Sequence, residues 1–374
     1  MVIEVAPDPI VCADGAMPDR LALPLWTLVA PVLGLLAALF GVAKMGSGGT
    51  VVAVVVLIAS ILAAVHHAEV IAHKVGEPFG TLVLAIAVTV IEVSLIVSLM
   101  LSDAGGATEL ARDTVFAAIM IILNFIIGLC LVAGAARHVE QRFTLTGMSA
   151  ALGVLTAMAV LSLILPNYTS STSGPTYATS QLVFVAVVSL ILYGTFILVQ
   201  TVRHRDYFLP ASDDHDDHAA PPSTRATGIA FGVLLVALAS VVLLAKTLSP
   251  TIEAAVLGAG LPLAVVGVVI AALVLAPESL AAYKAAKRNR LQTSLNLALG
   301  SALATIGLTI PSVAIVSLVL GLPLSLGIDP KSMTLLALSL FVATLSLGTG
   351  RTTVLQGVVH LVIFAAYLFT TIVP

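Results

Sequence analysis

Charged side chains are scarce in this chain, which excludes an ordinary water-soluble protein. Only 9% of its 374 residues are Asp, Glu, Lys or Arg, whereas 59% are hydrophobic, and the mean hydropathy is +1.15. A soluble domain cannot bury that much apolar surface, and the apolar runs reach the roughly 20 residues that a membrane-spanning helix needs. The composition therefore predicts an all-α integral membrane protein.

Other features that the sequence lacks narrow the class further. Its two cysteines, Cys12 and Cys130, provide neither a disulfide framework nor a metal-binding spacing. No aspartate falls within the apolar runs, which argues against a membrane-embedded prenyl transferase or aspartyl protease. No basic–aromatic patch indicates nucleic acid, and the first twenty residues lack the apolar core of a secretory signal. We therefore expect no resident cofactor and no nucleic-acid partner, with the lipid bilayer as the surroundings of the chain.

Eleven apolar segments are predicted to span the membrane. Counts of ten or twelve stay open, because the ninth segment is long and the tenth is short. The expected spans are 22–43, 49–68, 78–101, 114–134, 147–165, 181–201, 227–247, 254–277 (continuing to about 286), 294–321, 333–348 and 353–373.

The distribution of Lys and Arg predicts the orientation of the chain. With a cytoplasmic N-terminus, the segments on the inner side contain 12 basic residues and those on the outer side contain 4. Short cytoplasmic loops of membrane proteins carry such an excess. The outer loop 166–180 contains no basic residue. We therefore expect the N-terminus inside and the C-terminus outside.

A polar segment divides the chain into six spans and five. Residues 203–226 are expected to form an acidic cytoplasmic linker with an Asp/His run at 213–218. The linker is either a solvated hinge or a cation-attracting, pH-responsive loop, since histidine titrates near neutral pH. It separates a tail (1–21) and a first membrane half (22–202) from a second membrane half (227–374).

The two halves show weak internal symmetry. Each contains an intramembrane glutamate, Glu92 and Glu278, that follows another glutamate by 23 or 25 residues. The predicted orientation makes the third and eighth spans antiparallel. We therefore expect two inverted-topology repeats, about 68–134 and 253–321, with a binding site at their junction near the bilayer midplane.

Glu92 and Glu278 are the central candidates for binding a metal cation and protons. An acidic residue at membrane depth costs about 2.5–3.5 kcal/mol on insertion scales, and such residues are usually functional. Thr89 shares a helix face with Glu92, and Pro277 is expected to bend its helix and free backbone oxygens beside Glu278. The structural alternatives are a carboxylate bonded to a neighbouring helix and a carboxylate at a frayed helix end.

Further polar residues are candidates for the same site or its entrance. Ser301 and Thr305 share one face of the ninth span and are either ligands or packing residues with satisfied hydroxyls. Asn124, the one amide in the fourth span, is either a ligand or an interhelical hydrogen-bonding residue. The predicted entrance residues, which can equally be ordinary interfacial residues, are His66, His67, Glu69 and Glu77, with Glu253 as the outer counterpart of Glu69.

Motifs around both glutamates carry a family resemblance. Arg288-Asn289-Arg290-Leu291 and Gly300-Ser301-Ala302 follow Pro277-Glu278 at fixed offsets, and Gly76 and Gly80 lie between Glu69 and Glu92. With these motifs the chain resembles the bacterial Cha-type calcium/proton antiporters of the calcium/cation antiporter superfamily. It departs from the family's usual Gly-Asn pair, because Val88-Thr89 and Val274-Leu275 stand at those positions and Ala304 stands where a glutamine is common.

The resemblance implies a secondary transporter, not an enzyme, in a bacterial inner membrane. It would exchange cytoplasmic Ca²⁺ for external protons by alternating access. Glu92 and Glu278 would be the repeat carboxylates, and Asn124 and Ser301 polar residues of the following helices. Burial and mutual repulsion would keep the two acids occupied by protons or by a cation. The missing Gly-Asn ligands leave room for Na⁺ or K⁺. Two alternatives stay open: a sodium-coupled or broad-specificity monovalent cation exchanger, and a passive cation channel. The sequence does not determine the oligomeric state.

Overall fold

The protein is a bundle of membrane-length helices. The structure, a computed structural model, describes residues 23–76, 79–101, 108–208 and 222–374. Within these residues, nine helices are long and apolar enough to cross a membrane, and two shorter apolar stretches, Leu25–Leu39 and Leu82–Ser98, bring the set to eleven. A helix satisfies its own backbone hydrogen bonds, as a segment surrounded by lipid must. The prediction of an all-α membrane protein with about eleven helices is confirmed.

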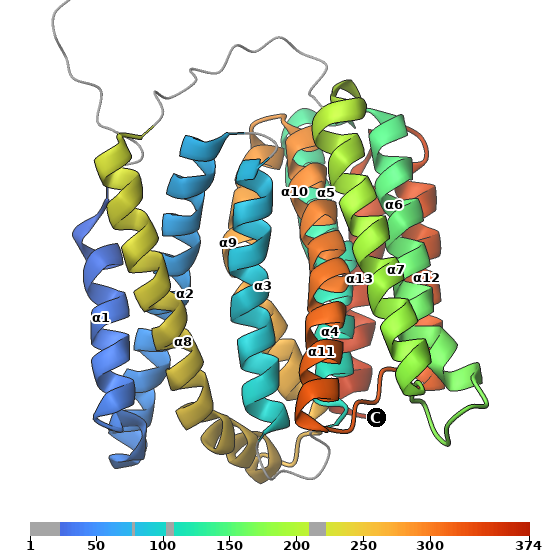
Figure 1. The fold of residues 1–374 in the computed structure, drawn as a ribbon. Coiled ribbons are helices and arrows are strands. Elements are labelled where there is room, and N and C mark those ends of the chain that lie inside the picture. The colour runs from blue at the N-terminus through green and yellow to red at the C-terminus, as the bar shows by residue number, and fades with distance from the viewer. Residues whose placement is uncertain (1–22, 77–78, 102–107, 209–221) are drawn as a thin grey trace, which may run out of the picture.

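Several of these long helices are interrupted by a π-helical turn, so one membrane-length helix can carry two labels in Figure 1. The elements are α1 (Leu25–Leu39), η1 (Val42–Lys44), α2 (Gly46–Val75), α3 (Phe79–Met100), α4 (Leu110–Met120), η2 (Ile121–Ile126), α5 (Ile127–His138), β1 (Gln141–Arg142), α6 (Leu145–Ala159), η3 (Val160–Ile164), η4 (Leu165–Tyr168), α7 (Thr179–Leu198), η5 (Val199–Arg203), η6 (Arg205–Tyr207), α8 (Thr224–Gly258), α9 (Ala264–Lys287), α10 (Leu291–Ala304), η7 (Thr305–Thr309), α11 (Ile310–Leu320), α12 (Pro330–Leu347), β2 (Arg351–Thr352) and α13 (Val354–Ile372).

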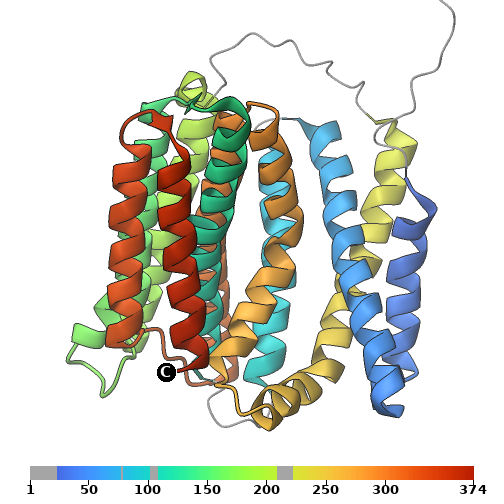
Figure 2. The same ribbon diagram turned by 180° about the vertical axis from the view of Figure 1, so that it is seen from behind.

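The helices form two groups with α3 and α9 between them. Helices α1, α2 and α8 stand together at one end of the molecule, and the remaining helices pack at the other end (Figures 1 and 2). Buried side chains form two hydrophobic clusters, and α3 and α9 contribute residues to both. The helices that carry Glu92 and Glu278 therefore lie at the boundary between the two clusters.

Helices α3 and α9 run in opposite directions. In Figure 1, α3 descends from the edge at which α2 ends, whereas α9 ascends to that same edge. This is the relation that opposite insertion of the third and eighth spans requires. Helix α9 continues without a break through Pro277, so the structure shows a proline within a continuous helix and no interruption before Glu278.

The predicted position of the loop between the seventh and eighth spans is wrong. Helix α8 extends from Thr224 to Gly258 with Pro250 inside it, and α9 begins only at Ala264. A proline inside a helix removes one backbone hydrogen bond and bends the helix, yet α8 continues through Pro250 instead of ending in a loop. Glu253, expected before the eighth span on the outer surface, therefore lies in α8, where its side chain is buried.

A short antiparallel pair of strands ties two loops together at one edge of the bundle. Gln141 of β1 pairs with Thr352 of β2, and Arg142 pairs with Arg351. The loops that contain them, α5–α6 and α12–α13, were both assigned to the cytoplasmic side by the charge distribution. The strand pair places these two loops at the same edge of the molecule. We call this edge of the bundle the linker edge, because η5 ends there, at the start of the linker 203–226, and α8 begins there.

Candidate functional site

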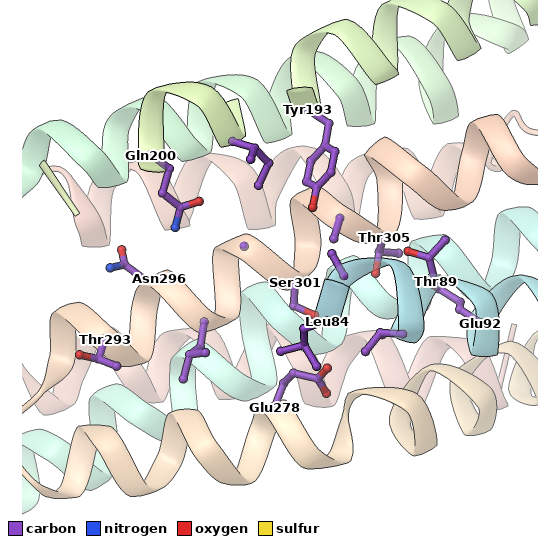
Figure 3. Close-up of a pocket in the computed structure, with 16 residues that line it drawn as sticks. Leu84, Thr89, Glu92, Tyr193, Gln200, Glu278, Thr293, Asn296, Ser301 and Thr305 are labelled. Atoms are coloured by element: carbon purple, nitrogen blue, oxygen red, sulfur yellow. The ribbon is translucent and has the colours of Figure 1, made fainter. Parts of the chain in front are cut away.

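A cavity of about 270 Å³ lies between α3, α7, α9, α10 and η7. Sixteen residues line it, and Figure 3 shows them as sticks. None of the sixteen is Lys, Arg or His, whereas two are glutamates. A cavity with this lining attracts cations rather than anions. Five residues that the sequence predicted for the site line it: Thr89, Glu92, Glu278, Ser301 and Thr305.

Glu92 lies in the wall of the cavity, and side chains of η7 hold its carboxylate, since Thr305 as well as Thr309 interacts with it. It lies near the middle of α3, and its side chain is only 2% exposed. The Thr309 hydroxyl donates to Glu92 Oε2 at 2.8 Å. Thr309 ends the π-helical turn η7, one turn after Thr305, and such turns are frequent at functional sites. One carboxylate oxygen of Glu92 is thus fixed, while the residue still faces the cavity.

Glu278 lines the same cavity from α9, and one of its carboxylate oxygens lacks a hydrogen-bond partner among the described residues. This oxygen is Oε2, which is buried. Glu92 and Glu69 both interact with Glu278 electrostatically. Figure 3 shows its carboxylate directed into the space between α9 and the helices α3 and α10. Because a bare buried charge is costly, this oxygen favours occupation by a proton or a cation.

The two glutamates do not belong to a larger cluster of metal-binding groups. Within the described part of the chain, no group of three or more His, Cys, Asp or Glu residues is placed to hold a metal ion. A cation in this cavity would therefore be held by carboxylates together with neutral oxygens, such as the hydroxyls of Thr89, Ser301 and Thr305.

Four polar residues that line the cavity were not predicted. Thr293 and Asn296 precede Ser301 on α10, and Asn296 lies one helical turn before Gly300, which also lines the cavity. The i, i+3 and i+4 spacing of this face is a signal that could have revealed both residues. Tyr193 and Gln200 come from α7 and η5, which belong to neither expected repeat, and no sequence motif marks them.

The cavity reaches toward the linker edge. Gln200 lies in the last turn before the end of η5, and Thr293 lies in the first turn of α10. Asn296 donates through Nδ2 to the Phe208 carbonyl at 2.6 Å and accepts through Oδ1 from Gln292 at 3.2 Å. The first part of the linker is thereby attached to a residue of the cavity wall.

Asn124 does not line this cavity. It lies fully buried in the π-helical turn η2, and its Nδ2 donates to the Ser339 hydroxyl of α12 at 2.8 Å. Of the two roles that the sequence left open, the structure shows the interhelical hydrogen bond. A ligand role for Asn124 in this cavity has no support in its position.

The predicted entrance residues do not come together at the cavity. His67 is fully buried, with Nε2 3.1 Å from a backbone carbonyl oxygen of α1, and the ring centre of His66 lies 5.5 Å from that of His67. Glu69 is exposed on α2 and reaches the site only through its electrostatic interaction with Glu278. Glu253 is buried in α8. Glu77, like the Asp/His run of the linker, lies outside the described residues.

Fold and cavity together define a multi-pass helical membrane protein with an acidic cavity between antiparallel helices. The family follows from the sequence. The chain belongs to the sodium/calcium exchanger protein family, whose model matches residues 45–202 and 229–373. The two matched stretches lie on either side of the linker.

Several proteins are similar to this chain over most of its length. A putative ionic transporter, y4hA of Sinorhizobium fredii, is 52% identical over 94% of this chain and 97% of its own length. The sodium-potassium/proton antiporter ChaA of Escherichia coli is 35% identical over 85% of this chain and 87% of its own length. The structure of native YfkE shares the fold, with a TM-score of 0.72 and 16% identity over 93% of this chain and all of YfkE. The structure of the H⁺/Ca²⁺ exchanger CAX also shares the fold, with a TM-score of 0.69 and 14% identity over 92% of this chain and 88% of CAX.

Proposed function

We propose that this protein is a secondary active transporter that exchanges a metal cation for protons across a bacterial cytoplasmic membrane. The observation that carries the proposal is the placement of Glu92 and Glu278 in one cavity whose lining contains no basic residue. The names of its relatives support it, since ChaA is a sodium-potassium/proton antiporter and another relative, from Aphanothece halophytica, is a Ca²⁺/H⁺ antiporter.

Competition for the two carboxylates accounts for the exchange. Ionised and empty, Glu92 and Glu278 would be two like charges in a largely buried site, which is unfavourable. Two protons relieve that cost, and so does a cation. If only these neutralised forms pass between the two sides of the membrane, inward movement of protons is coupled to outward movement of the cation.

Ca²⁺ is the cation that two carboxylates suit best. It takes six to eight oxygen ligands, and the two glutamates with Thr89, Ser301, Thr305 and water can provide them. Na⁺ or K⁺ is the second candidate, because the relative at 35% identity is a sodium-potassium/proton antiporter. Val88-Thr89 and Val274-Leu275, in place of the two Gly-Asn pairs, also reduce the number of side-chain ligands.

The proposal includes an orientation and a transport cycle. The excess of basic residues supports an orientation with the linker edge in the cytoplasm, the N-terminus inside and the C-terminus outside. Because the cavity extends toward that edge, we infer a state that is open to the cytoplasm. The two membrane halves, 22–202 and 227–374, would rearrange to expose the same glutamates to the other side.

Reconstituted vesicles with a trapped pH indicator test the proposal. Addition of Ca²⁺, Na⁺ or K⁺ should move protons through the unaltered protein. Glu92→Gln and Glu278→Gln should each abolish this movement while the protein stays inserted, because a neutral amide cannot exchange a proton for a cation. Glu140→Gln is the matched control, since Glu140 lies beside Arg351 on the surface, with 3.4 Å between Oε1 and Nε.

Two results would contradict the proposal. Near-normal exchange by either glutamine variant would show that the site is elsewhere. Cation flux through the unaltered protein without any opposing proton movement would indicate a passive channel instead of an antiporter.

A further inference from the structure

Tyr193 places a phenol in the cavity from a helix outside the two expected repeats. Its side chain is 4% exposed, and it lines the cavity together with both glutamates. In Figure 3 the ring extends from α7 with its hydroxyl directed toward Ser301 and Thr305. No hydrogen bond of this hydroxyl is found among the described residues, so its oxygen lone pairs and its proton are available to a ligand.

A glycine in the π-helical turn fixes where the ring lies. A Cβ atom added at Gly307 would lie 2.5 Å from Tyr193 Cβ and 2.8 Å from its Cγ. Only glycine allows α7 to approach η7 this closely. The same turn carries Thr305, which lines the cavity, and Thr309, which binds Glu92. The phenol is therefore positioned by packing against the turn that also orients the glutamate.

The Tyr193 hydroxyl adds a neutral oxygen donor to the cavity. Ala304 and Gly300 line the wall of α10 without offering side-chain oxygens, and one oxygen of Glu92 is already bonded to Thr309. Tyrosine ordinarily titrates near pH 10, so its phenol keeps its proton at neutral pH. It can bind a cation through its oxygen without taking part in the exchange of protons.

We propose that the Tyr193 hydroxyl is a neutral ligand of the transported cation and helps to set which cation is preferred. The proposal rests on the cation/proton exchange proposed above. Its physical basis is that Ca²⁺ requires more oxygens than the two glutamates supply, so removing one neutral oxygen weakens Ca²⁺ binding more than binding of Na⁺ or K⁺.

Tyr193→Phe removes the hydroxyl and keeps the ring that packs against Gly307. We expect the KM for Ca²⁺ in proton-coupled exchange to rise about tenfold, in keeping with loss of one interaction with a charged partner. The KM for Na⁺ or K⁺ should rise less, and the maximal rate and its pH dependence should stay unchanged. Tyr367→Phe is the matched control, because Tyr367 is equally buried, at 3% exposure, but lies on α13 outside this cavity.

Binding is measured separately, as the rise in thermal unfolding temperature that Ca²⁺ produces in detergent. A smaller rise for Tyr193→Phe than for Tyr367→Phe supports the ligand role. Unchanged KM values for every cation would overturn it. An equal fall in maximal rate for all cations with unchanged KM would show a purely structural role and would overturn it too. If the unaltered protein exchanges no cation for protons, the proposed function fails instead, whatever Tyr193→Phe does.

Discussion

The two glutamates are equivalent in the sequence pattern but not in their surroundings. Glu92 is 2% exposed and accepts a hydrogen bond from Thr309. Glu278 has a buried oxygen without a partner among the described residues. The hydrogen bond keeps Glu92 in one orientation, whereas Glu278 is left to meet an arriving cation or proton. The difference arises from η7, whose backbone geometry the sequence pattern did not indicate.

Thr309→Val tests the importance of this hydrogen bond. Valine keeps the shape of threonine but cannot donate to Glu92. A hydrogen bond to a charged group contributes about 1.5–3 kcal/mol, so the apparent affinity for the cation should fall by about tenfold or more. Initial rates of exchange against cation concentration measure the change. Thr309→Ser, which retains the hydroxyl, should behave as the unaltered protein does, and a Thr309→Val variant with unchanged affinity would argue against the role of the bond.

Polar residues were predictable where they interrupt an apolar run. Thr89, Glu92 and Glu278 stand out for this reason, and the i, i+4 spacing of Ser301 and Thr305 places both on one face. Tyr193 could not be found in this way, since an aromatic residue in an apolar helix usually packs in a core and only the close approach of α7 to η7 brings it to the cavity. Asn124 was ambiguous because its partner, Ser339, is 215 residues away.

Among the elements, α5 and α13 pack through a pair of glycines. A Cβ atom added at Gly357 would lie 2.8 Å from the Gly128 carbonyl oxygen and 2.8 Å from the Val132 nitrogen. Both are backbone atoms of α5 and cannot move aside as a side chain can. Small residues permit such close packing between membrane helices. The contact joins a helix of the first half to the last helix of the chain.

Gly357→Ala should destabilise the protein, because the added methyl group forces α5 and α13 apart. Overpacking of this kind costs about 1–3 kcal/mol. Gly153→Ala in α6 is the matched control, since nothing lies within 4 Å of the added Cβ atom and alanine favours a helix over glycine by about 1 kcal/mol. Thermal unfolding in detergent should show a lower midpoint for Gly357→Ala and an equal or higher one for Gly153→Ala. The reverse order would contradict the packing argument.

Hydropathy predicted the elements well, and it failed where a helix continues beyond the lipid-spanning length. The eleven expected spans correspond to the eleven helices, but the seventh span was expected to end at residue 247, whereas α8 continues to Gly258. A proline bends a helix but need not end it, and α8 continues through Pro250. The misplaced boundary moved Glu253 to the wrong element.

Over the whole molecule, the two edges of the bundle differ. The cavity with Glu92 and Glu278 extends toward the linker edge. At the opposite edge Arg112 is bonded to Glu109 and Asp113, each at 2.9 Å, and donates to the Gly327 carbonyl at 3.0 Å. These bonds tie α4 to the loop before α12. Nearby, burial disfavours ionisation of Asp329, but hydrogen bonds from Ser332 outweigh it and hold the pKa of that carboxyl below its usual value. At this second edge, the bonds of Arg112 therefore link α4 to the loop before α12.

Cysteine accessibility can test this asymmetry and the orientation together. In a Cys12→Ser background the native Cys130 is buried at 1% exposure, so a membrane-impermeant maleimide should report only introduced cysteines. Thr293→Cys lies in the cavity, Thr224→Cys is exposed at the linker edge, and Ser173→Cys is exposed in the loop at the opposite edge. Thr293→Cys should react from the same side as Thr224→Cys, and a saturating cation should slow its reaction, because the cation occupies the cavity. In intact cells only Ser173→Cys should react if the charge distribution orients the chain as proposed. Reaction of Thr293→Cys from the side of Ser173→Cys would mean that the cavity opens through the edge that Arg112 holds together, and the cytoplasm-open state would have to be abandoned.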